Sequence, residues 1–136
     1  HEAGISIGSM YDLFTSKRIL LDFLIRCTIE PDFIDTPQEL PLDASLFGEL
    51  EAQVTAAFET IVNRFEKPLE NGCEQYSYSQ MLSDAFDVLS KYGTGCMLVE
   101  SNPETFGSLF ALYTRYRKRF YDAVEQYVNV FRARGL

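Results

Sequence analysis

The sequence predicts an all-α fold, and three observations lead to this prediction. Apolar residues recur at three- and four-residue steps over most of the chain. Ser, Thr or Asn precedes these segments as an N-cap, and Pro or Gly follows them. The 136 residues, of which 46% are hydrophobic and 24% charged, are typical of a globular chain with one sizeable core.

Two helices are expected before the first proline. Ser6 is a good N-cap for a short helix that runs to about Phe14. Thr15 and Ser16 then cap a second helix over residues 17–29. The apolar stripe of this second helix is expected to bury Ile19, Leu20, Phe23, Leu24 and Cys27.

An acidic connector follows and marks the predicted domain boundary. It is interrupted by three prolines, Pro31, Pro37 and Pro41. No basic residue occurs between Arg26 and Arg64, whereas carboxylates are frequent there. We therefore expect one domain over residues 1–30 and a second, larger helical domain over residues 31–136.

Two long helices are expected next. The first begins at Ser45, ends near Pro68 and the following Asn-Gly pair, and carries the apolar residues Leu46, Leu50, Val54, Phe58, Ile61 and Phe65. The second covers residues 79–92 and is expected to bury Met81, Leu82, Ala85, Phe86 and Leu89. The Gly-Thr-Gly run at residues 93–95 is expected to interrupt it.

The last part of the chain predicts one more long helix. Residues 96–99 fit either a buried helical turn or a short strand, and the helical surroundings favour helix. Asn102 as N-cap and Pro103 at the first helical position predict where the last helix begins. Its apolar stripe continues to Gly135 and comprises Phe106, Leu109, Phe110, Tyr113, Tyr116, Phe120, Val124, Tyr127 and Phe131.

The most informative segment is residues 3–17, which predicts a tight turn, a very short helix, a second turn and the start of a longer helix. This order is typical of the second half of a helix-turn-helix unit, whose short recognition helix enters the major groove of DNA. Gly4 permits a positive φ in the turn, and the hydroxyl of Tyr11 and the ammonium of Lys17 can reach phosphates. The candidate DNA-binding residues are Ser6, Ile7, Gly8, Ser9, Tyr11, Asp12 and Lys17.

This segment resembles the TetR-type family of bacterial transcriptional regulators. The residues at family spacing are Ala3, Gly4, Ser6, Gly8, Ser9, Tyr11, Phe14, Ser16, Lys17 and Leu20. The resemblance implies a homodimeric repressor with a small N-terminal DNA-binding domain and a larger helical domain that binds a small-molecule inducer. Asp12 and Leu13 depart from the family, whose recognition helices usually carry polar, aromatic or basic residues at these positions.

The resemblance also bears on the two ends of the chain. The motif begins in its middle, so its first half is expected upstream of His1. In the family, further helices commonly follow the long helix that ends here, and these helices build the dimer interface. If Leu136 is the true C-terminus, the family's usual dimer geometry is not expected in this protein.

The composition limits the classes of function. The formal charge is −8, and because DNA binding needs positive charge, the acidic connector is expected to face away from DNA. Cys27, Cys73 and Cys96 form no CxxC pair, and His1 is the only histidine. We therefore expect no metal site, no cofactor and no enzyme. The odd number of cysteines fits reduced thiols, so we expect a cytoplasmic location. The chain has no run of eighteen apolar residues, so we expect no membrane partner.

The aromatic residues suggest a ligand pocket. Most of them must be core, but tyrosines on the stripe of the last helix need hydrogen-bond partners and favour a pocket for a small apolar or aromatic effector. The candidate ligand-binding residues are Phe86, Phe106, Phe110, Tyr113 and Tyr116. For the basic run at residues 115–119, a solvated helix face is favoured over an anion-binding patch.

The sequence thus predicts a ligand-responsive transcriptional regulator, acting as a repressor. It would bind double-stranded operator DNA as a homodimer and be released by a small apolar or aromatic effector. The alternative is a helical protein-interaction module that has lost DNA binding, which the charge of −8 and the carboxylate of Asp12 favour.

Overall fold

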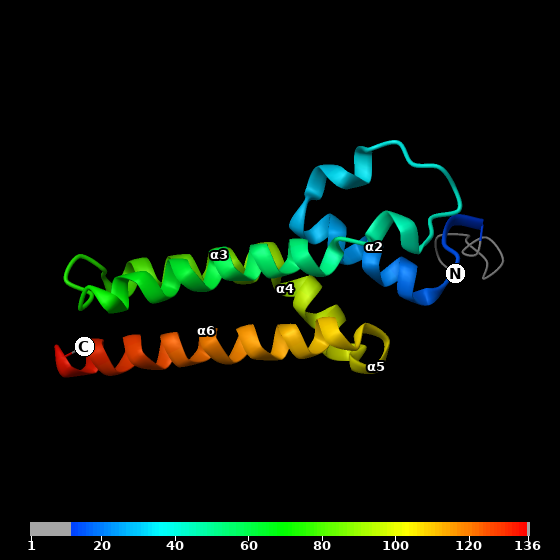
Figure 1. Ribbon diagram of the computed structural model, residues 1–136. Coiled ribbons are helices and arrows are strands. Elements are labelled where there is room, and N and C mark those ends of the chain that lie inside the picture. Colours follow the sequence, from blue (N-terminus) through cyan, green and yellow to red (C-terminus); the bar gives the residue numbers. More distant parts are fainter. Residues whose placement is uncertain (1–11, 136) are drawn as a thin grey trace, which may run out of the picture.

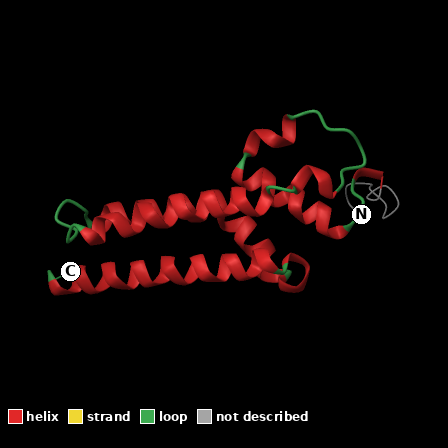
Figure 2. Cartoon of the chain, in the orientation of Figure 1, coloured by secondary structure: helices red, strands yellow, loops and turns green. Residues whose placement is uncertain are grey.

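A computed structural model describes residues 12–135, and it confirms an all-α fold (Figures 1 and 2). Three long helices, α3 (Leu50–Glu70), α4 (Tyr78–Ser101) and α6 (Ser108–Ala133), run lengthwise, and α6 packs against both α3 and α4. The shorter α2 (Lys17–Ile29) lies at one end of this group and packs against α4 and α3. Within the described part of the chain, no helix is both long and apolar enough to cross a membrane.

Helix α2 has the predicted bounds. The side chain of Ser16 caps it by accepting a hydrogen bond from the backbone N–H of Ile19 at 3.2 Å. The predicted buried stripe is partly wrong, since the buried residues are Ile19, Leu21, Asp22 and Ile25, and Leu24 is exposed. Apolar residues of α2 are spread around most of its circumference, so periodicity alone did not identify the side of the helix that packs against α4.

The acidic connector folds back onto the start of α2. It contains two short 3₁₀ helices, η1 (Pro31–Asp35) and η2 (Ala44–Phe47). Between them, the N–H of Leu42 donates to the carbonyl of Leu13 at 2.7 Å, and the N–H of Thr15 donates to the carbonyl of Leu42 at 3.1 Å. Leu42 and one phenylalanine from each 3₁₀ helix are buried, so the connector contributes to the core.

Helix α3 begins later than predicted. Residues 44–47 form η2 instead of its first turn, and the chain passes Gly48 before α3 starts at Leu50. The predicted end near Pro68 is confirmed, because α3 ends at Glu70 and Gly72 follows with a φ of +71°.

Helix α4 is unbroken, so the predicted interruption at residues 93–95 is wrong, whereas the helical assignment of residues 96–99 is confirmed. Gly95 has a packing reason to be glycine. A Cβ atom at this position would lie 2.9 Å from Cγ2 of Thr28 in α2. The cost of a glycine inside a helix, about 1 kcal/mol, is thus offset by the close approach of two helices.

The predicted burial along α4 is wrong at three of five positions. Met81 is buried and Ala85 half-buried, but the side chains of Leu82, Phe86 and Leu89 are exposed. The apolar arc of α4 is wider than the surface that its neighbours α2 and α6 cover. The spacing therefore identified the apolar face of α4 correctly. It did not predict which part of this face neighbouring helices leave uncovered.

The predicted final helix is divided in two. A short α5 (Pro103–Phe106) ends at Gly107, which has a φ of +55°, and α6 then begins at Ser108. The side chain of Asn102 does not cap α5 as predicted. It donates instead to the carbonyl of Leu98 at 2.9 Å and so satisfies the end of α4.

Candidate functional site

A cavity of about 310 Å³ lies between α3, α4 and α6, at the low end of the range for small-molecule pockets. Its lining is mainly apolar and aromatic, with one acidic and one basic side chain. α3 contributes Phe58, Ile61 and Val62; α4 contributes Val88, Leu89, Tyr92, Gly93, Cys96, Met97 and Glu100; and α6 contributes Tyr113, Tyr116, Arg117, Phe120 and Tyr121. We call this cavity the α3–α4–α6 pocket.

Helical spacing explains why these side chains converge. On α4, Val88, Tyr92 and Cys96 follow one another at four-residue steps and therefore share one face. Gly93 lies beside this row, and a Cβ atom there would meet no other atom within 4 Å. The missing side chain of Gly93 thus leaves part of the pocket wall open.

The polar end of the pocket joins α4 to α6. The hydroxyl of Tyr113 and Nη1 of Arg117 both donate to Oε1 of Glu100, each at 2.6 Å. The hydrogen bond from Tyr113, followed by that from Arg117, lowers the pKa of Glu100. Burial, followed by the hydrogen bond to Glu100, raises the pKa of Tyr113. At neutral pH, Glu100 and Arg117 are therefore an ion pair and Tyr113 is neutral, so the charges in the lining cancel.

The thiol of Cys96 in this lining is suited to packing rather than to reaction. Burial is the main cause that raises its pKa above the usual range, and the nearby Glu100 raises it further. A cysteine kept protonated is a poor nucleophile and a poor metal ligand. Cys96 therefore acts as an apolar part of the pocket wall.

The pocket is connected to α2 through shared wall residues. A narrow gap of about 20 Å³ lies between the pocket and α2, and its lining includes Ile25, Thr28 and Ile29 of α2. The same gap is lined by four residues that also line the pocket, namely Phe58, Tyr92, Cys96 and Tyr113. Only one layer of side chains thus separates the pocket from α2.

The predicted ligand-binding residues are distributed over three environments. Tyr113 and Tyr116 line the pocket. Phe106, the last residue of α5, is completely buried, Phe110 is half-buried outside the pocket, and Phe86 is exposed on α4. Among the pocket residues not selected from the sequence are Phe58, Tyr92 and Phe120. The four-residue spacing of residues 88, 92 and 96 could have predicted the α4 wall of the pocket. It was missed because the helix was expected to be interrupted at residues 93–95.

Most of the candidate DNA-binding residues, Ser6, Ile7, Gly8, Ser9 and Tyr11, lie outside the described residues. The two that are described, Asp12 and Lys17, are both exposed. Lys17 is the first residue of α2, directly after the cap residue Ser16. Its ammonium group is therefore at the end of α2 that adjoins the helix-turn-helix segment.

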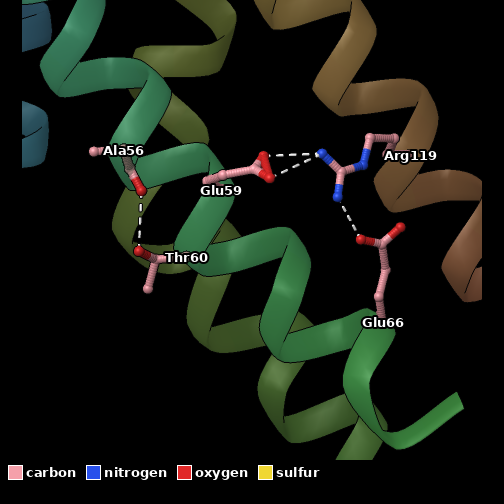
Figure 3. A network of polar contacts seen from close by, with 5 residues as sticks. All are labelled: Ala56, Glu59, Thr60, Glu66 and Arg119. Carbon is pink, nitrogen blue, oxygen red and sulfur yellow. Dashed lines mark hydrogen bonds and ion pairs between the residues drawn. The ribbon is translucent and has the colours of Figure 1, made fainter. Parts of the chain in front are cut away.

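Three of the four basic residues in the run at residues 115–119 pair with carboxylates of the described chain. Arg119 donates to Glu59 at 2.9 Å and to Glu66 at 2.5 Å, and so joins α6 to two turns of α3 (Figure 3). Lys118 pairs with Asp122 at 2.7 Å. Together with the pairing of Arg117, these contacts favour a structural role over an anion-binding patch.

A larger hollow of about 530 Å³ lies at the other end of α3, around the turn at residues 71–76. Most of its lining residues are of polar or charged types, and the guanidinium group of one of them, Arg64, pairs with the buried carboxylate of Asp84 at 2.7 Å. Fewer apolar and aromatic side chains line it than line the α3–α4–α6 pocket. The α3–α4–α6 pocket is therefore the candidate site, and the chemistry of its lining is suited to binding. Comparisons of the chain with protein-family models, with curated proteins and with solved structures find no match.

Proposed function

We propose that this chain is a ligand-responsive transcriptional regulator. It binds double-stranded operator DNA through the helix-turn-helix segment at residues 3–17 and is released by a small apolar or aromatic effector in the α3–α4–α6 pocket. The observation that carries the proposal is the position of the pocket beside α2. α2 starts at Lys17, directly after the predicted recognition helix, so a change in the pocket has a short route to the DNA-binding segment.

Two contacts support this route. Gly95 of α4 packs closely against Thr28 of α2, since a Cβ atom on Gly95 would lie 2.9 Å from Cγ2 of Thr28. At the start of α2, Arg18 donates to the carbonyl of Thr105 in α5 at 2.5 Å. An effector that moves α4 relative to α6 would thus reorient α2. It changes DNA affinity only to the extent that it binds the two orientations with different affinity.

The lining indicates the class of effector. Most of the wall is apolar or aromatic, and its one carboxylate is neutralised by Arg117 at 2.6 Å. A net charge on the ligand would remain without a counter-charge in a largely apolar site, which is costly. We therefore propose an uncharged effector, and a hydrogen-bond donor on it can use Oε2 of Glu100, since both bonds in the described structure go to Oε1.

A homodimer is part of the proposal, because helix-turn-helix regulators commonly read two half-sites with two copies of the recognition helix. The test is a fluorescence titration of the full-length protein against the DNA upstream of its own gene, at two salt concentrations. We expect a preferred site over random DNA and an affinity that falls steeply with salt. Binding no better than to random DNA would overturn the regulator proposal.

That second outcome would favour a helical module that binds a protein partner and has lost DNA binding. Large apolar side chains exposed on α4 and α6 support this candidate, as does the charge of −8. The two candidates differ in what binds the protein, and the DNA titration distinguishes them directly.

A further inference from the structure

The acidic connector supplies a hydrogen-bond partner to the end of the predicted recognition helix. Asp12 and Leu13 are helical and Phe14 is not, so this helix ends at Leu13, close to its predicted end. The last carbonyl groups of a helix have no partner within the helix and need one from outside it. The carbonyl of Leu13 accepts a hydrogen bond from the backbone N–H of Leu42 at 2.7 Å, so its partner comes from the connector.

A second backbone bond completes this contact on the other side of Phe14. The N–H of Thr15 donates to the carbonyl of Leu42 at 3.1 Å, and the two bonds make a parallel β-bridge between Phe14 and Leu42. Leu42 is only 5% exposed, so both bonds lie largely out of contact with water. The connector therefore holds the turn between the predicted recognition helix and α2 by its backbone.

A row of phenylalanine rings supports the same turn. The ring centroid of Phe23 in α2 lies 5.5 Å from that of Phe14 and 5.7 Å from that of Phe33 in η1. The ring centroid of Phe33 lies 6.3 Å from that of Phe47 in η2. These separations are in the range of favourable aromatic pairs. The row thus joins the turn to both 3₁₀ helices of the connector.

The connector is itself held by α2 and α3. Figure 1 shows it leaving the end of α2 and returning toward the start of that helix. The guanidinium group of Arg26 in α2 lies 4.6 Å from the centre of the Phe33 ring and donates to Oε1 of Gln53 in α3 at 3.1 Å. Phe47, at the end of η2 and shortly before α3, is buried. Because the connector is fixed on both sides of Leu42, it can hold the turn in one geometry.

We propose that Leu42 is a positioning residue for operator recognition. Its two backbone bonds and its buried side chain fix the angle between the recognition helix and α2. This inference rests on the proposed function, because it concerns the segment that contacts DNA there. Reading bases needs a recognition helix held in one orientation in the major groove, whereas phosphate contacts carry no sequence information. The effect of Leu42 therefore falls on discrimination between DNA sequences.

The contact is tested without DNA, by hydrogen exchange of single backbone amides in the full-length protein, followed by NMR. In the wild type we expect the amide of Thr15 to be protected, and in Leu42→Ala to exchange at least about tenfold faster. Leu40→Ala is the matched control, because Leu40 is 60% exposed in the same connector, and its Thr15 amide should exchange as in wild type. A Thr15 amide that is unprotected in the wild type overturns the proposal without any variant.

The positioning role is tested by fluorescence titration of the same proteins with the DNA upstream of the gene and with random DNA. In Leu42→Ala we expect the ratio of the two affinities to fall at least about tenfold, with an unchanged slope of log affinity against log salt. Leu42→Met, which conserves the volume, should restore the ratio, and Leu40→Ala should leave it unchanged. Circular dichroism checks that the variants are folded.

The outcomes separate this role from the regulator proposal. An unchanged ratio in Leu42→Ala, or an equal loss of affinity for both DNAs, overturns the positioning role and leaves the regulator proposal standing. A wild type without preference for the upstream DNA overturns both. Protection of the Thr15 amide would then assign Leu42 to the stability of the turn alone.

Discussion

The hydroxyl of Tyr113 in α6 donates a hydrogen bond to Oε1 of Glu100 in α4, at 2.6 Å. This bond holds the ring of Tyr113 in the wall of the pocket and connects the two helices that the proposed effector would separate. It also couples the protonation of the carboxylate to folding, because it lowers the pKa of Glu100 while it raises that of Tyr113.

The lowered pKa of Glu100 predicts a pH-dependent contribution to stability. Between the folded and unfolded pKa values the unfolded chain binds more protons, so stability rises with pH through this window. The contribution is present above the usual range of a glutamate and is lost as the pH falls through the lowered pKa. The excess unfolding free energy of wild type over Glu100→Gln should therefore decrease from pH 6 to pH 3, as measured by urea denaturation.

Glu104→Gln is the control for this measurement. Glu104 is exposed in α5, and the described residues give it no hydrogen-bond partner. Its difference from wild type should stay small and nearly constant over the same pH range. A constant difference for Glu100→Gln as well would contradict the coupling between Glu100 and Tyr113.

The contact between Gly95 and Thr28 predicts opposite effects of alanine at two glycines of one helix. Gly95→Ala should lower the unfolding free energy by about 1 to 3 kcal/mol, because its Cβ atom would lie 2.9 Å from Thr28. Gly93→Ala should raise it by about 0.5 to 1 kcal/mol, since its Cβ atom meets no atom within 4 Å and alanine favours helix. Thermal and urea denaturation measure both. Equal effects at the two positions would show that α4 does not approach α2 closely.

The open space at Gly93 predicts that the pocket can be filled from this position. The probe is N-phenyl-1-naphthylamine, an uncharged aromatic molecule that fluoresces in apolar sites. A leucine there would project into the cavity, so Gly93→Leu should weaken the binding of N-phenyl-1-naphthylamine at least about tenfold. Thr94→Leu is the control, because Thr94 is exposed on the same helix and does not line the pocket. If both leucine variants bind the molecule as wild type does, it binds elsewhere.

The charge balance in the pocket predicts selection against anions. 8-Anilino-1-naphthalenesulfonate has the aromatic framework of N-phenyl-1-naphthylamine plus a sulfonate group. We expect it to bind the wild type at least about tenfold more weakly, because Glu100 already engages the basic group of the lining, Arg117. Competition between the two molecules, followed by fluorescence, measures the ratio. Tighter binding of the sulfonate would contradict an uncharged effector and indicate that Arg117 is available.

Local signals predicted the fold wherever short-range chemistry decides the structure. The cap at Ser16 and the Gly72 turn set the bounds of α2 and the end of α3 correctly, because both act through backbone geometry within a few residues. The Gly-Thr-Gly run in α4 was misinterpreted for the opposite reason. Gly95 is explained by Thr28, a residue of another helix, and no local pattern contains that contact.

The pocket was predicted less completely than the fold. The tyrosines of α6 were identified from their stripe, and Tyr113 and Tyr116 do line the cavity. Phe106 and Phe86 also lie on predicted apolar helix faces. Phe106 is completely buried, however, and Phe86 is largely exposed. Periodicity assigns a residue to a helix face, whereas the angle between neighbouring helices decides whether that face meets a core, a cavity or solvent.

Lys17 offers a direct test of the DNA-binding proposal within the described residues. It is exposed at the first position of α2, where a phosphate would interact with both its ammonium group and the helix N-terminus. Lys17→Ala should weaken binding to operator and random DNA alike and reduce the slope of log affinity against log salt by about one. Lys91→Ala, an exposed lysine on α4, should leave the slope unchanged. An unchanged slope in Lys17→Ala would exclude Lys17 as a phosphate contact, and a loss confined to the operator would assign it to base recognition.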